Sequence, residues 1–409
     1  MVATTPTAHR TIWTAVLVAA LGYFVDVFDI WLFANFRIKS LTDLGFAGDA
    51  LVTEGAFLLN CQQAGLLIGG FVWGILGDKF GRMRAMFGSI LIYSLANIGN
   101  AFVETVPAYA ALRFIAGFGL AGEIGTGITL VSELMPKDKR GYGVTIVATV
   151  GVAGAVAAAY VGKVMAWRDA FLLGGVMGLS LLLLRVAVHE SGMFEAAKTR
   201  TDIRRGSLKL LIECPRRLGR FIGCVALGIP IWVIFGLYGV FAPEIAVSIG
   251  ITTPIDVPSS LLWASIGITV GDLISGLLSQ WLRSRKKPIA YFMILGLLLL
   301  AILHSGAITT PTQFYTLYGL LGFSVGFWIC GLAVSAEQFG TNIRATVATT
   351  VPNLVRATAI PLTAGFVALR PLIGAAEAAL ILAISGFACS AIALRYLAET
   401  FGRDLDFVE

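Results

Sequence analysis

The sequence is poor in charge, in cysteine and in histidine. Only 13% of its 409 residues are charged, against roughly 25% in soluble domains, which excludes an ordinary soluble globular protein. The five cysteines are scattered without CxxC or metal-ligand spacing, which argues against a disulfide framework and a structural metal site. The three histidines lie in the N-terminal tail or near the ends of apolar segments, with no nucleophile motif beside them. We therefore expect no metal and no catalytic site.

Apolar residues make up 57% of the chain, and the mean hydropathy is +0.85. Apolar stretches of about twenty residues recur along the whole length, each long enough to cross roughly 30 Å of hydrocarbon. The first stretch has no small-residue cleavage site, which indicates a retained helix rather than a removed signal. The pattern predicts an all-α integral membrane protein surrounded by lipid bilayer. Twelve spans are predicted, or ten or eleven if a short-looped pair is misread, at about 12–36, 54–77, 86–104, 108–134, 142–165, 169–188, 219–249, 258–282, 288–308, 312–337, 345–369 and 375–397.

The basic residues predict the orientation. With a cytoplasmic N-terminus, 22 of the 30 Lys and Arg residues fall in the terminal segments or in connections on the cytoplasmic side. This asymmetry follows the positive-inside rule, so we expect both termini in the cytoplasm. The net charge of +6 then reflects topology, and no nucleic-acid partner is expected. Five basic residues are predicted on the other side: Arg37, Lys39, Lys163, Arg168 and Arg370.

The chain carries an internal duplication. GILGDKFGRMRA (74–85) aligns with GLLSQWLRSRKK (276–287) at an offset of 202 positions, and ELMPKDKRG (133–141) aligns with EQFGTNIRA (337–345) at an offset of 204. Two matches at nearly one offset indicate two halves of six spans each, in the same orientation. We expect three parts, which are a six-helix bundle at 1–188, a cytoplasmic central linker at 189–217 and a second six-helix bundle at 218–409.

The charged connections in these matches predict contacts that hold helix ends together in one state of the molecule and break in another. In the segment 77–84, acidic and basic side chains can reach neighbouring helix ends or opposite charges. In its copy at 279–286, the basic residues are interpreted as fixing topology only. In the second match, Glu and Arg are seven positions apart in both copies. The candidate gating residues are Gly77, Asp78, Gly81, Arg82, Glu133, Arg140, Glu337 and Arg344.

These segments resemble the major facilitator superfamily. GDKFGRMR (77–84) resembles its loop motif G-x-x-x-D-[RK]-x-G-[RK]-[RK], with Met83 in a place that is usually basic. RFIAGFGLAGEIGTGITLVSELMPKDKRG (113–141) resembles the fourth helix and following loop of the sugar-porter-like and metabolite–proton-symporter branches. HESGMFE (189–195) resembles a motif after the sixth helix but lacks its Pro and Arg. The resemblance covers essentially the whole chain and implies the major facilitator fold, with twelve helices in two pseudo-symmetric halves, and secondary transport by alternating access.

Six ionisable side chains stand out well inside the predicted spans. Each costs roughly 2.5–3.5 kcal/mol on insertion scales, so each is a candidate for function. None lies in the third, sixth, ninth or twelfth span, which face lipid in the family that the chain resembles. The six are Asp26, Asp29, Arg113, Glu123, Asp272 and Arg356.

Asp26 and Asp29 are one helical turn apart, with about 5–6 Å between them. Two ionised carboxylates so close are unfavourable in a medium of low dielectric, so one of them is expected to hold a proton. Depth places Asp29 and Arg113 in the same half of the membrane. The segment resembles the D-G-[FY]-D motif of aromatic-acid and metabolite–proton symporters, with Val27 in place of Gly, which implies that Asp29 and Arg113 couple transport to protons; the alternative is a static ion pair. Glu123 can bind substrate, carry a second proton or bond a neighbouring helix.

Asp272 and Arg356 fall near the middle of the membrane. They either neutralise each other or leave Arg356 to bind a substrate carboxylate, because a guanidinium makes bidentate hydrogen bonds to planar anions. Pro352 and Pro361 flank Arg356 and can loosen its helix. Further substrate-binding candidates, which helix packing would also explain, are Gln63, Asn353, Trp232, Tyr238 and Trp328.

The remaining motifs narrow the function. GFGLAG (117–122) matches G-x-G-x-x-G, but it lies inside a span and follows no strand, so no dinucleotide site is expected. We expect no cofactor and take the proton gradient as the driving force. The sequence predicts a monomeric, proton-coupled importer of a small organic solute, an organic acid above all, in a bacterial inner membrane. Alternative cargoes are a sugar, an organic cation or a metal ion, and alternative classes are a non-transporting receptor and a membrane-embedded enzyme.

Overall fold

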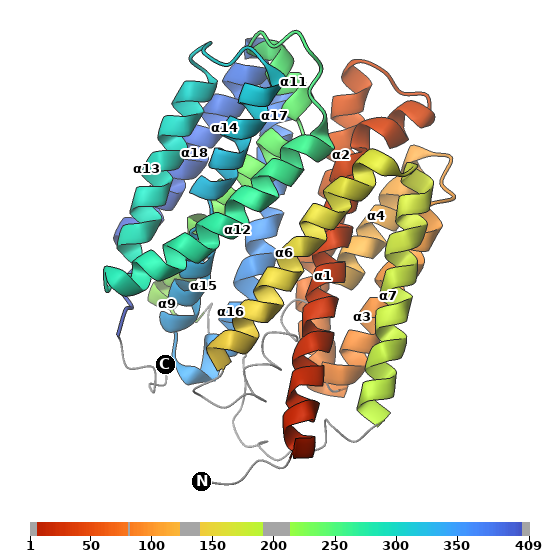
Figure 1. Ribbon diagram of the computed structural model, residues 1–409, viewed down its shortest axis with the longest axis vertical. Coiled ribbons are helices and arrows are strands. Elements are labelled where there is room, and N and C mark those ends of the chain that lie inside the picture. Colours follow the sequence, from red (N-terminus) through yellow and green to blue (C-terminus); the bar gives the residue numbers. More distant parts are fainter. Residues whose placement is uncertain (1–5, 81, 123–139, 191–212, 403–409) are drawn as a thin grey trace. The chain divides into compact units, whose positions relative to one another are not determined.

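A computed structural model describes residues 6–80, 82–122, 140–190 and 213–402 (Figure 1). Every regular element within those ranges is a helix, as predicted. The chain packs as two compact units. One comprises Met1–Ser40 and Ala64–Ile203, and the other comprises Leu41–Gln63 and Arg204–Glu409.

The helices follow one another with short connections. Up to residue 190 they are α1 (Pro6–Asp43), α2 (Asp49–Phe80), α3 (Arg82–Asn100), α4 (Val106–Leu120), α6 (Arg140–Val164) and α7 (Trp167–Glu190). From residue 213 they are α9 (Pro215–Leu227), α10 (Ile229–Trp232), the π-helix η2 (Val233–Gly239), α11 (Ala242–Ser248), α12 (Val257–Trp281), α13 (Lys286–Leu303), α14 (Pro311–Ser324), α15 (Trp328–Glu337), α16 (Thr341–Ala357), α17 (Ala359–Ile373) and α18 (Ala375–Tyr396).

Each of the twelve predicted spans coincides with a helix or a run of helices. In the described part of the chain, nine are long and apolar enough to cross a membrane, and two shorter apolar helices, Val106–Leu120 and Val150–Val164, accompany them. The predicted span 108–134 is described only as far as α4 and the turn at 121–122. The prediction of an all-α, multi-pass membrane protein is confirmed.

Two helix ends differ from the prediction. Helix α1 continues to Asp43, so Arg37 and Lys39 belong to a helix and not to a connection. Helix α2 continues to Phe80 and α3 begins at Arg82, so most of the predicted connection at 77–84 is helical. A helix satisfies its own backbone hydrogen bonds, so it can continue where the apolar run stops. The hydropathy pattern therefore marks the hydrocarbon-crossing part of a helix better than the end of the helix.

Three predicted spans of the second unit are broken. The seventh is divided into α9, α10, η2 and α11, with Pro230 close to the first break. A proline has no N–H to continue the helix, and π-helical turns are frequent at functional sites. The tenth is broken between Ser324 and Trp328, and the eleventh at Thr358. Discontinuous spans of this kind free backbone groups that can face a cavity.

Close glycine packing repeats in the two halves. On α2, Gly65 and Gly69 lie against the backbone of α4, and a Cβ at either would meet carbonyl oxygens of that helix. On α12, Gly267 and Gly271, each 202 positions later, lie in the same way against α14. Pairs of small residues four apart let helix backbones approach closely. This contact repeats at the same offset as the charged connections, which supports the predicted duplication.

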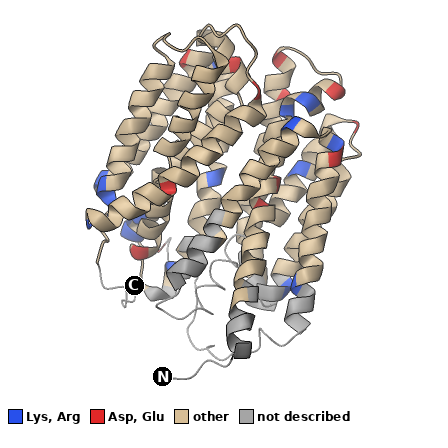
Figure 2. Ribbon diagram, in the orientation of Figure 1, with Lys and Arg blue, Asp and Glu red and all other residues tan. Residues whose placement is uncertain are grey.

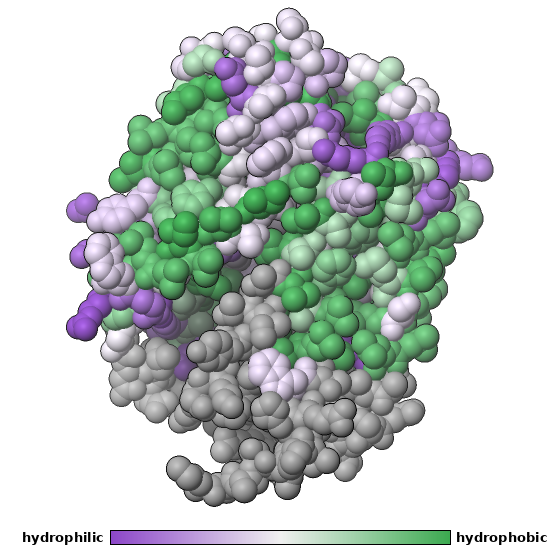
Figure 3. All heavy atoms as spheres, viewed as in Figure 1, coloured by the Kyte–Doolittle hydropathy of each residue, from purple (hydrophilic) through white to green (hydrophobic). Residues whose placement is uncertain are grey.

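The charged residues lie mostly near the ends of the helices (Figure 2). Large apolar side chains are exposed along the helix faces between them, and they dominate the described surface in Figure 3. Examples are Leu183 on α7, Leu277 on α12 and Ile392 on α18. An exposed apolar area this extensive marks a surface covered by lipid rather than by water.

Candidate functional site

Arg113, on α4, is fully buried in the first unit. Its Nη2 donates a hydrogen bond to Oδ1 of Asn97 at 2.7 Å, and its Nε donates to Oδ1 of Asn100 at 3.2 Å. The guanidinium also lies over the ring of Phe171 on α7, 4.5 Å from the ring centroid. Side chains from α3 and α7 therefore hold the guanidinium in one orientation.

Asp26 and Asp29, on α1, are both fully buried in the same unit. Asp29 lies within electrostatic range of Arg113. Its carboxylate packs against α7 at Gly174, where there is no room for a Cβ atom. Asp29, with Asp26 one turn before it, is thus buried in the same unit as Arg113 and within electrostatic range of it.

This arrangement can respond to a proton. Ionised Asp29 stabilises the neighbouring guanidinium, and protonation of its carboxyl group removes that attraction. Arg113 then still donates to its two asparagine acceptors, so it keeps these two hydrogen bonds while its electrostatic surroundings change. A buried charge whose partner can be neutralised without leaving it unbonded is suited to repeated switching.

Arg37 is a buried charge that the sequence analysis missed. It is fully buried on α1, although the charge count assigned it to an outer connection. The apolar residues Ile38 and Leu41 follow it in the chain, and Leu41 is fully buried. That continuation of the apolar pattern was the available signal that the helix extends past Arg37.

All the predicted substrate-binding residues lie in the second unit. Arg356, on α16, donates from Nη1 to Oδ1 of Asn353 over 3.5 Å, and Asn353 is buried. Gln63 is buried on the part of α2 that packs with this unit. Nearby in the chain, Oδ1 of Asn60 accepts a hydrogen bond of 2.6 Å from Oγ1 of Thr363 on α17. Polar side chains of α2 therefore reach the broken eleventh span.

Two tryptophan rings pack closely against glycines, where a larger residue would leave no room for the ring. The ring of Trp328, the first residue of α15, packs beside Gly228, where a Cβ would lie 2.9 Å from its Cζ3 and 2.6 Å from Cγ1 of Val355. Val355 directly precedes Arg356, so Trp328 lies against the segment that carries the arginine. The buried ring of Trp232 packs in the same manner against Gly236.

Tyr238 contacts the end of α13. Its hydroxyl oxygen lies 2.8 Å from Nε2 of His304, and the two rings meet edge to face. The hydroxyl group of Tyr238 is therefore hydrogen-bonded to the histidine.

Asp272, on α12, accepts a hydrogen bond of 3.0 Å from the backbone N–H of Ile329 in the first turn of α15. This contact differs from both roles that the sequence suggested, an ion pair with Arg356 and a substrate contact. A carboxylate within a span can be stabilised by a helix N-terminus as well as by a basic side chain.

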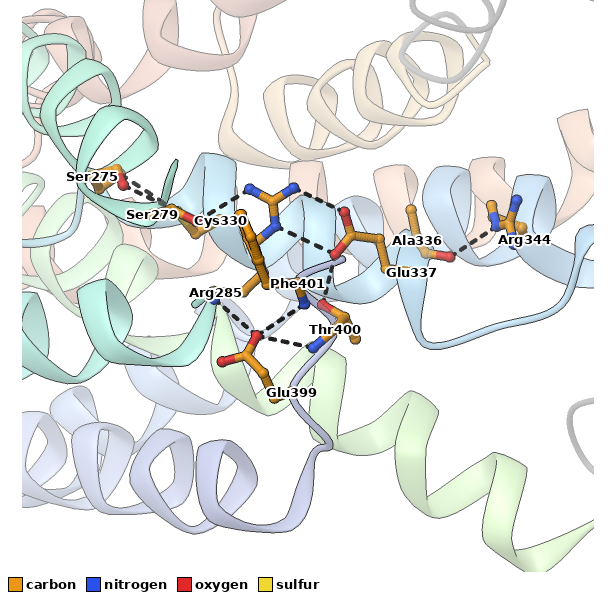
Figure 4. A network of polar contacts seen from close by, with 10 residues as sticks. All are labelled: Ser275, Ser279, Arg285, Cys330, Ala336, Glu337, Arg344, Glu399, Thr400 and Phe401. Carbon is orange, nitrogen blue, oxygen red and sulfur yellow. Dashed lines mark hydrogen bonds and ion pairs between the residues drawn. The ribbon is translucent and has the colours of Figure 1, made fainter. Parts of the chain in front are cut away.

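A polar network joins α12, α13, α15 and the segment after α18 (Figure 4). Arg285 forms an ion pair with Glu337, with 3.1 Å between Nη2 and Oε1, and Oγ1 of Thr400 donates to Oε2 of Glu337 at 2.6 Å. Glu337 was a predicted gating residue, whereas Arg285 had been given a role in topology only. The duplication aligns Arg285 with Met83, so the first copy offered no hint of its partner. Arg344 donates from Nε to the backbone oxygens of Ala336 and Phe339.

Glu399 anchors the same network. Its carboxylate accepts hydrogen bonds from the hydroxyl of Ser284 and from the backbone N–H groups of Arg285 and Phe401. Partial burial tends to raise the pKa of Glu399, but these donors stabilise the charged form and together lower the pKa to about 2. Glu399 is therefore ionised throughout the physiological pH range.

The other predicted residues are only partly described. Gly81, Glu123 and Glu133 lie outside the described residues. The remaining gating candidates lie in helices, but their side chains are outside the description: Gly77, Asp78, Arg82 and Arg140. Among the described residues, no group of three or more His, Cys, Asp or Glu side chains could hold a metal ion.

Comparison with known proteins matches residues 19–364 to the Major Facilitator Superfamily model. A putative metabolite transport protein of Haemophilus influenzae is 28% identical over 84% of this chain and 86% of its own length. The niacin transporter of Acinetobacter baylyi is 26% identical over 81% of each chain. The benzoate transport protein of the same organism is 23% identical over 72% of this chain and 70% of its own length.

Among solved structures, the D-xylose–proton symporter has the same fold. Its TM-score is 0.70 at 16% sequence identity, and the match covers 96% of this chain and 100% of the symporter. The two units of helices, the buried charges on α1 and α4 and the broken spans fit this assignment. The chain belongs to the Major Facilitator Superfamily and is a multi-pass membrane transporter of a small molecule, not an enzyme.

Proposed function

We propose that this protein is a proton-coupled symporter that imports a small organic acid, with an aromatic monocarboxylate as the best-supported cargo. Two relatives are named for the transport of niacin and of benzoate, and both of these compounds are planar carboxylic acids. A conformational cycle of alternating access would carry the cargo and the proton in the same direction.

The observation that carries the coupling is the buried group formed by Asp29, Arg113, Asn97 and Asn100. A proton that enters from outside neutralises Asp29 and weakens its attraction to Arg113. The change in electrostatic energy favours a different conformation, from which the proton leaves toward the cytoplasm. Asp26, one turn away, disfavours full ionisation of the pair and so helps one carboxyl group to hold a proton.

Arg356 is the proposed partner of the cargo carboxylate. A guanidinium makes two parallel hydrogen bonds to a carboxylate, and such charge-assisted bonds are roughly twice as strong as neutral ones. Trp328 lies near Val355, the residue before Arg356, so the proposed cargo site has an aromatic ring beside the segment that carries the arginine. Charge recognition combined with an aromatic wall suits a benzoate-like molecule.

The proposal includes the location and the form of the protein. We infer a bacterial inner membrane with both termini in the cytoplasm, because the basic residues are concentrated in the connections on that side. The Arg285–Glu337 network would then lie at the cytoplasmic ends of its helices and act as a gate. The working form would be a monomer with a first bundle at 1–188, a linker at 189–217 and a second bundle at 218–409, and it would need no cofactor besides the proton gradient.

Uptake of labelled benzoate and nicotinate into proteoliposomes with an alkaline interior tests the proposal. Wild-type protein should accumulate at least one of them, and a protonophore should abolish the accumulation. Asp29→Asn should lose accumulation but keep the exchange of internal for external cargo, whereas Asp169→Asn, at an exposed acid of α7, should behave as wild type. Normal accumulation by Asp29→Asn would refute the coupling role, and no response to any carboxylate would refute the cargo class.

A further inference from the structure

Helix α15 begins within the second unit without a cap of its own. The residue before it, Phe327, makes no side-chain capping hydrogen bond. The start of a helix leaves its first N–H groups without partners inside the helix, and the hydrocarbon offers no water to replace them. Asp272 supplies the missing acceptor from α12. Its Oδ1 accepts from the N–H of Ile329 at 3.0 Å.

The break before α15 packs against the turn of α12 that carries Asp272. Oγ of Ser275 donates to the carbonyl oxygen of Gly326 at 2.6 Å. A Cβ on Gly326 would lie 2.5 Å from the carbonyl carbon of Gly271 and 2.6 Å from the amide nitrogen of Asp272. The backbones therefore touch at this point, and one turn of α12 fixes where α14 ends and α15 starts.

The first half of the chain has no acidic residue at the position that corresponds to Asp272. The offset of 202 aligns Asp272 with Gly70, whereas it aligns Ser275 with Trp73. Trp73 also bonds its neighbouring helix, from Nε1 to the carbonyl oxygen of Phe118 at 2.7 Å. Both halves thus keep a donor on this face, but only the second half adds a carboxylate. That half holds all the cargo-binding candidates except Gln63.

We propose that Asp272 is a positioning residue for cargo recognition, which caps α15 from the neighbouring helix and thereby fixes the place of Trp328 beside the segment that carries Arg356. The inference rests on the proposed function. The carboxylate faces the positive end of the helix dipole, which stabilises its charge. Its effect on the cargo passes through the backbone of α15, so it needs no contact with the cargo.

Uptake of benzoate by wild type and two variants separates this role from a direct one. Asp272→Asn keeps an oxygen that can accept the N–H bond, whereas Asp272→Ala keeps none. Asp272→Ala should raise the KM roughly 3- to 30-fold, the range for a lost helix cap, and Asp272→Asn should stay within about twofold of wild type. The pH dependence of benzoate uptake should be the same for wild type and for both variants. Equal impairment of the two variants, or a displaced pH profile in Asp272→Asn, would overturn the proposal, since the charge itself would then be required.

Asp256→Ala is the matched control. Asp256 caps α12, accepting from the N–H of Ser259 at 2.8 Å, at the start of the helix and away from α15. This variant should lower the thermal stability without raising the KM. A rise in KM equal to that of Asp272→Ala would show a general effect of lost caps and overturn the positioning role.

Thermal unfolding of the purified protein provides a readout independent of the cargo. The Tm of Asp272→Ala should fall below that of wild type, with Asp272→Asn close to wild type. Should Asp272→Ala not fold, Asp272→Ser, whose hydroxyl is an accepted cap, takes its place with a smaller loss. An unchanged Tm for Asp272→Ala would overturn the claim that Asp272 caps α15. If wild-type protein transports no carboxylate, the proposed function fails while the Tm series still decides the cap.

Discussion

At the scale of single residues, Arg113 shows how a permanent charge is accommodated where water is excluded. Two asparagine oxygens and an aromatic face contact the guanidinium without neutralising it. A carboxylate as sole partner would fix the pair in one state, because removing either member of a buried ion pair leaves an uncompensated charge. Neutral acceptors keep Arg113 bonded while the charge on Asp29 changes.

Asn97→Ala should impair coupling more than folding. It removes the shorter of the two side-chain hydrogen bonds to Arg113, and a buried donor left without its acceptor costs about 1–3 kcal/mol. We expect a lower Tm and a reduced pH-driven accumulation of cargo. Asn35→Ala is the control, because Asn35 is also buried in this unit but donates to the Trp31 carbonyl of its own helix. Accumulation reduced equally in both variants would contradict the specific role of Asn97.

Residue-scale prediction succeeded where a charge had to lie inside a span. Asp29 and Arg113 were found because ionisable groups are rare in hydrocarbon and because depth along two helices can be counted. Arg37 was missed because it lies just beyond the apolar core of its helix, where a charge is unremarkable. Arg285 was missed because its partner Glu337 is 52 positions away, and no local pattern relates them.

At the scale of the elements, the paired glycines set how closely the helices pack. Gly65 and Gly69 seat α2 on α4, and Gly267 and Gly271 seat α12 on α14. Association of helices in lipid relies on such close contact because apolar side chains gain little from leaving one apolar medium for another. The two contacts are therefore main determinants of the packing within each half.

Gly267→Ala should destabilise the second half. A Cβ there would clash with the carbonyl oxygen of Gly319, a backbone atom that cannot turn aside, and overpacking costs about 1–3 kcal/mol or more. Gly276→Ala on the same helix is the matched control, since its Cβ would lie 3.7 Å from Cγ2 of Ile329. We expect a clear fall in Tm for the first and none for the second. Equal Tm values would contradict the packing role.

Glu399→Gln should lower the stability to the same extent at pH 5.5 and at pH 7.5. The pKa of Glu399 is about 2 in the folded protein and about 4.3 in an unfolded chain. Because the folded value is the lower one, the stabilisation is complete above about pH 4.3 and is lost only as the pH falls toward about 2. Glu104→Gln, at an exposed acid, should leave the Tm unchanged. A loss of stability that grows or shrinks between the two pH values would contradict the low pKa.

Element-scale prediction gave the spans and one of their three breaks. Twenty-residue apolar runs are strong signals, so every predicted span meets a helix or helix run. Pro352 and Pro361 correctly pointed to an irregular eleventh span, which breaks at Thr358. The π-helix at Val233–Gly239 and the break at Gly326 could not be predicted. Both depend on acceptors and donors from other helices, such as Asp272, Ser275 and Tyr318.

At the scale of the whole molecule, the candidate chemistry is divided between the two units. The described coupling candidates Asp26, Asp29 and Arg113 belong to the first unit, and the cargo-binding candidates belong to the second. The duplication itself was visible in the sequence because the charged connections and their spacing survive in both copies. The division was not visible beforehand, because it depends on how the first part of α2 packs: Leu41–Gln63 groups with the second unit.

Asp29→Asn and Arg356→Lys should therefore impair transport in different ways. A lysine cannot form the bidentate contact, so Arg356→Lys should raise the KM for benzoate roughly 10- to 100-fold, with accumulation intact at saturating cargo. Asp29→Asn should abolish accumulation and leave cargo affinity nearly unchanged. The double variant should show both defects, a raised KM in exchange and no accumulation. The same defect in both single variants would contradict the division.

The repeated glycine contact has a consequence for how such a protein evolves. After a gene duplication, both halves of the protein inherit the same close helix packing. Selection can then change side chains in one half while the other half stays constant. On the proposed division of roles, mutations in the second copy can change the cargo while the residues proposed for proton coupling in the first copy stay as they are. Related transporters can then differ in cargo while they share one driving force.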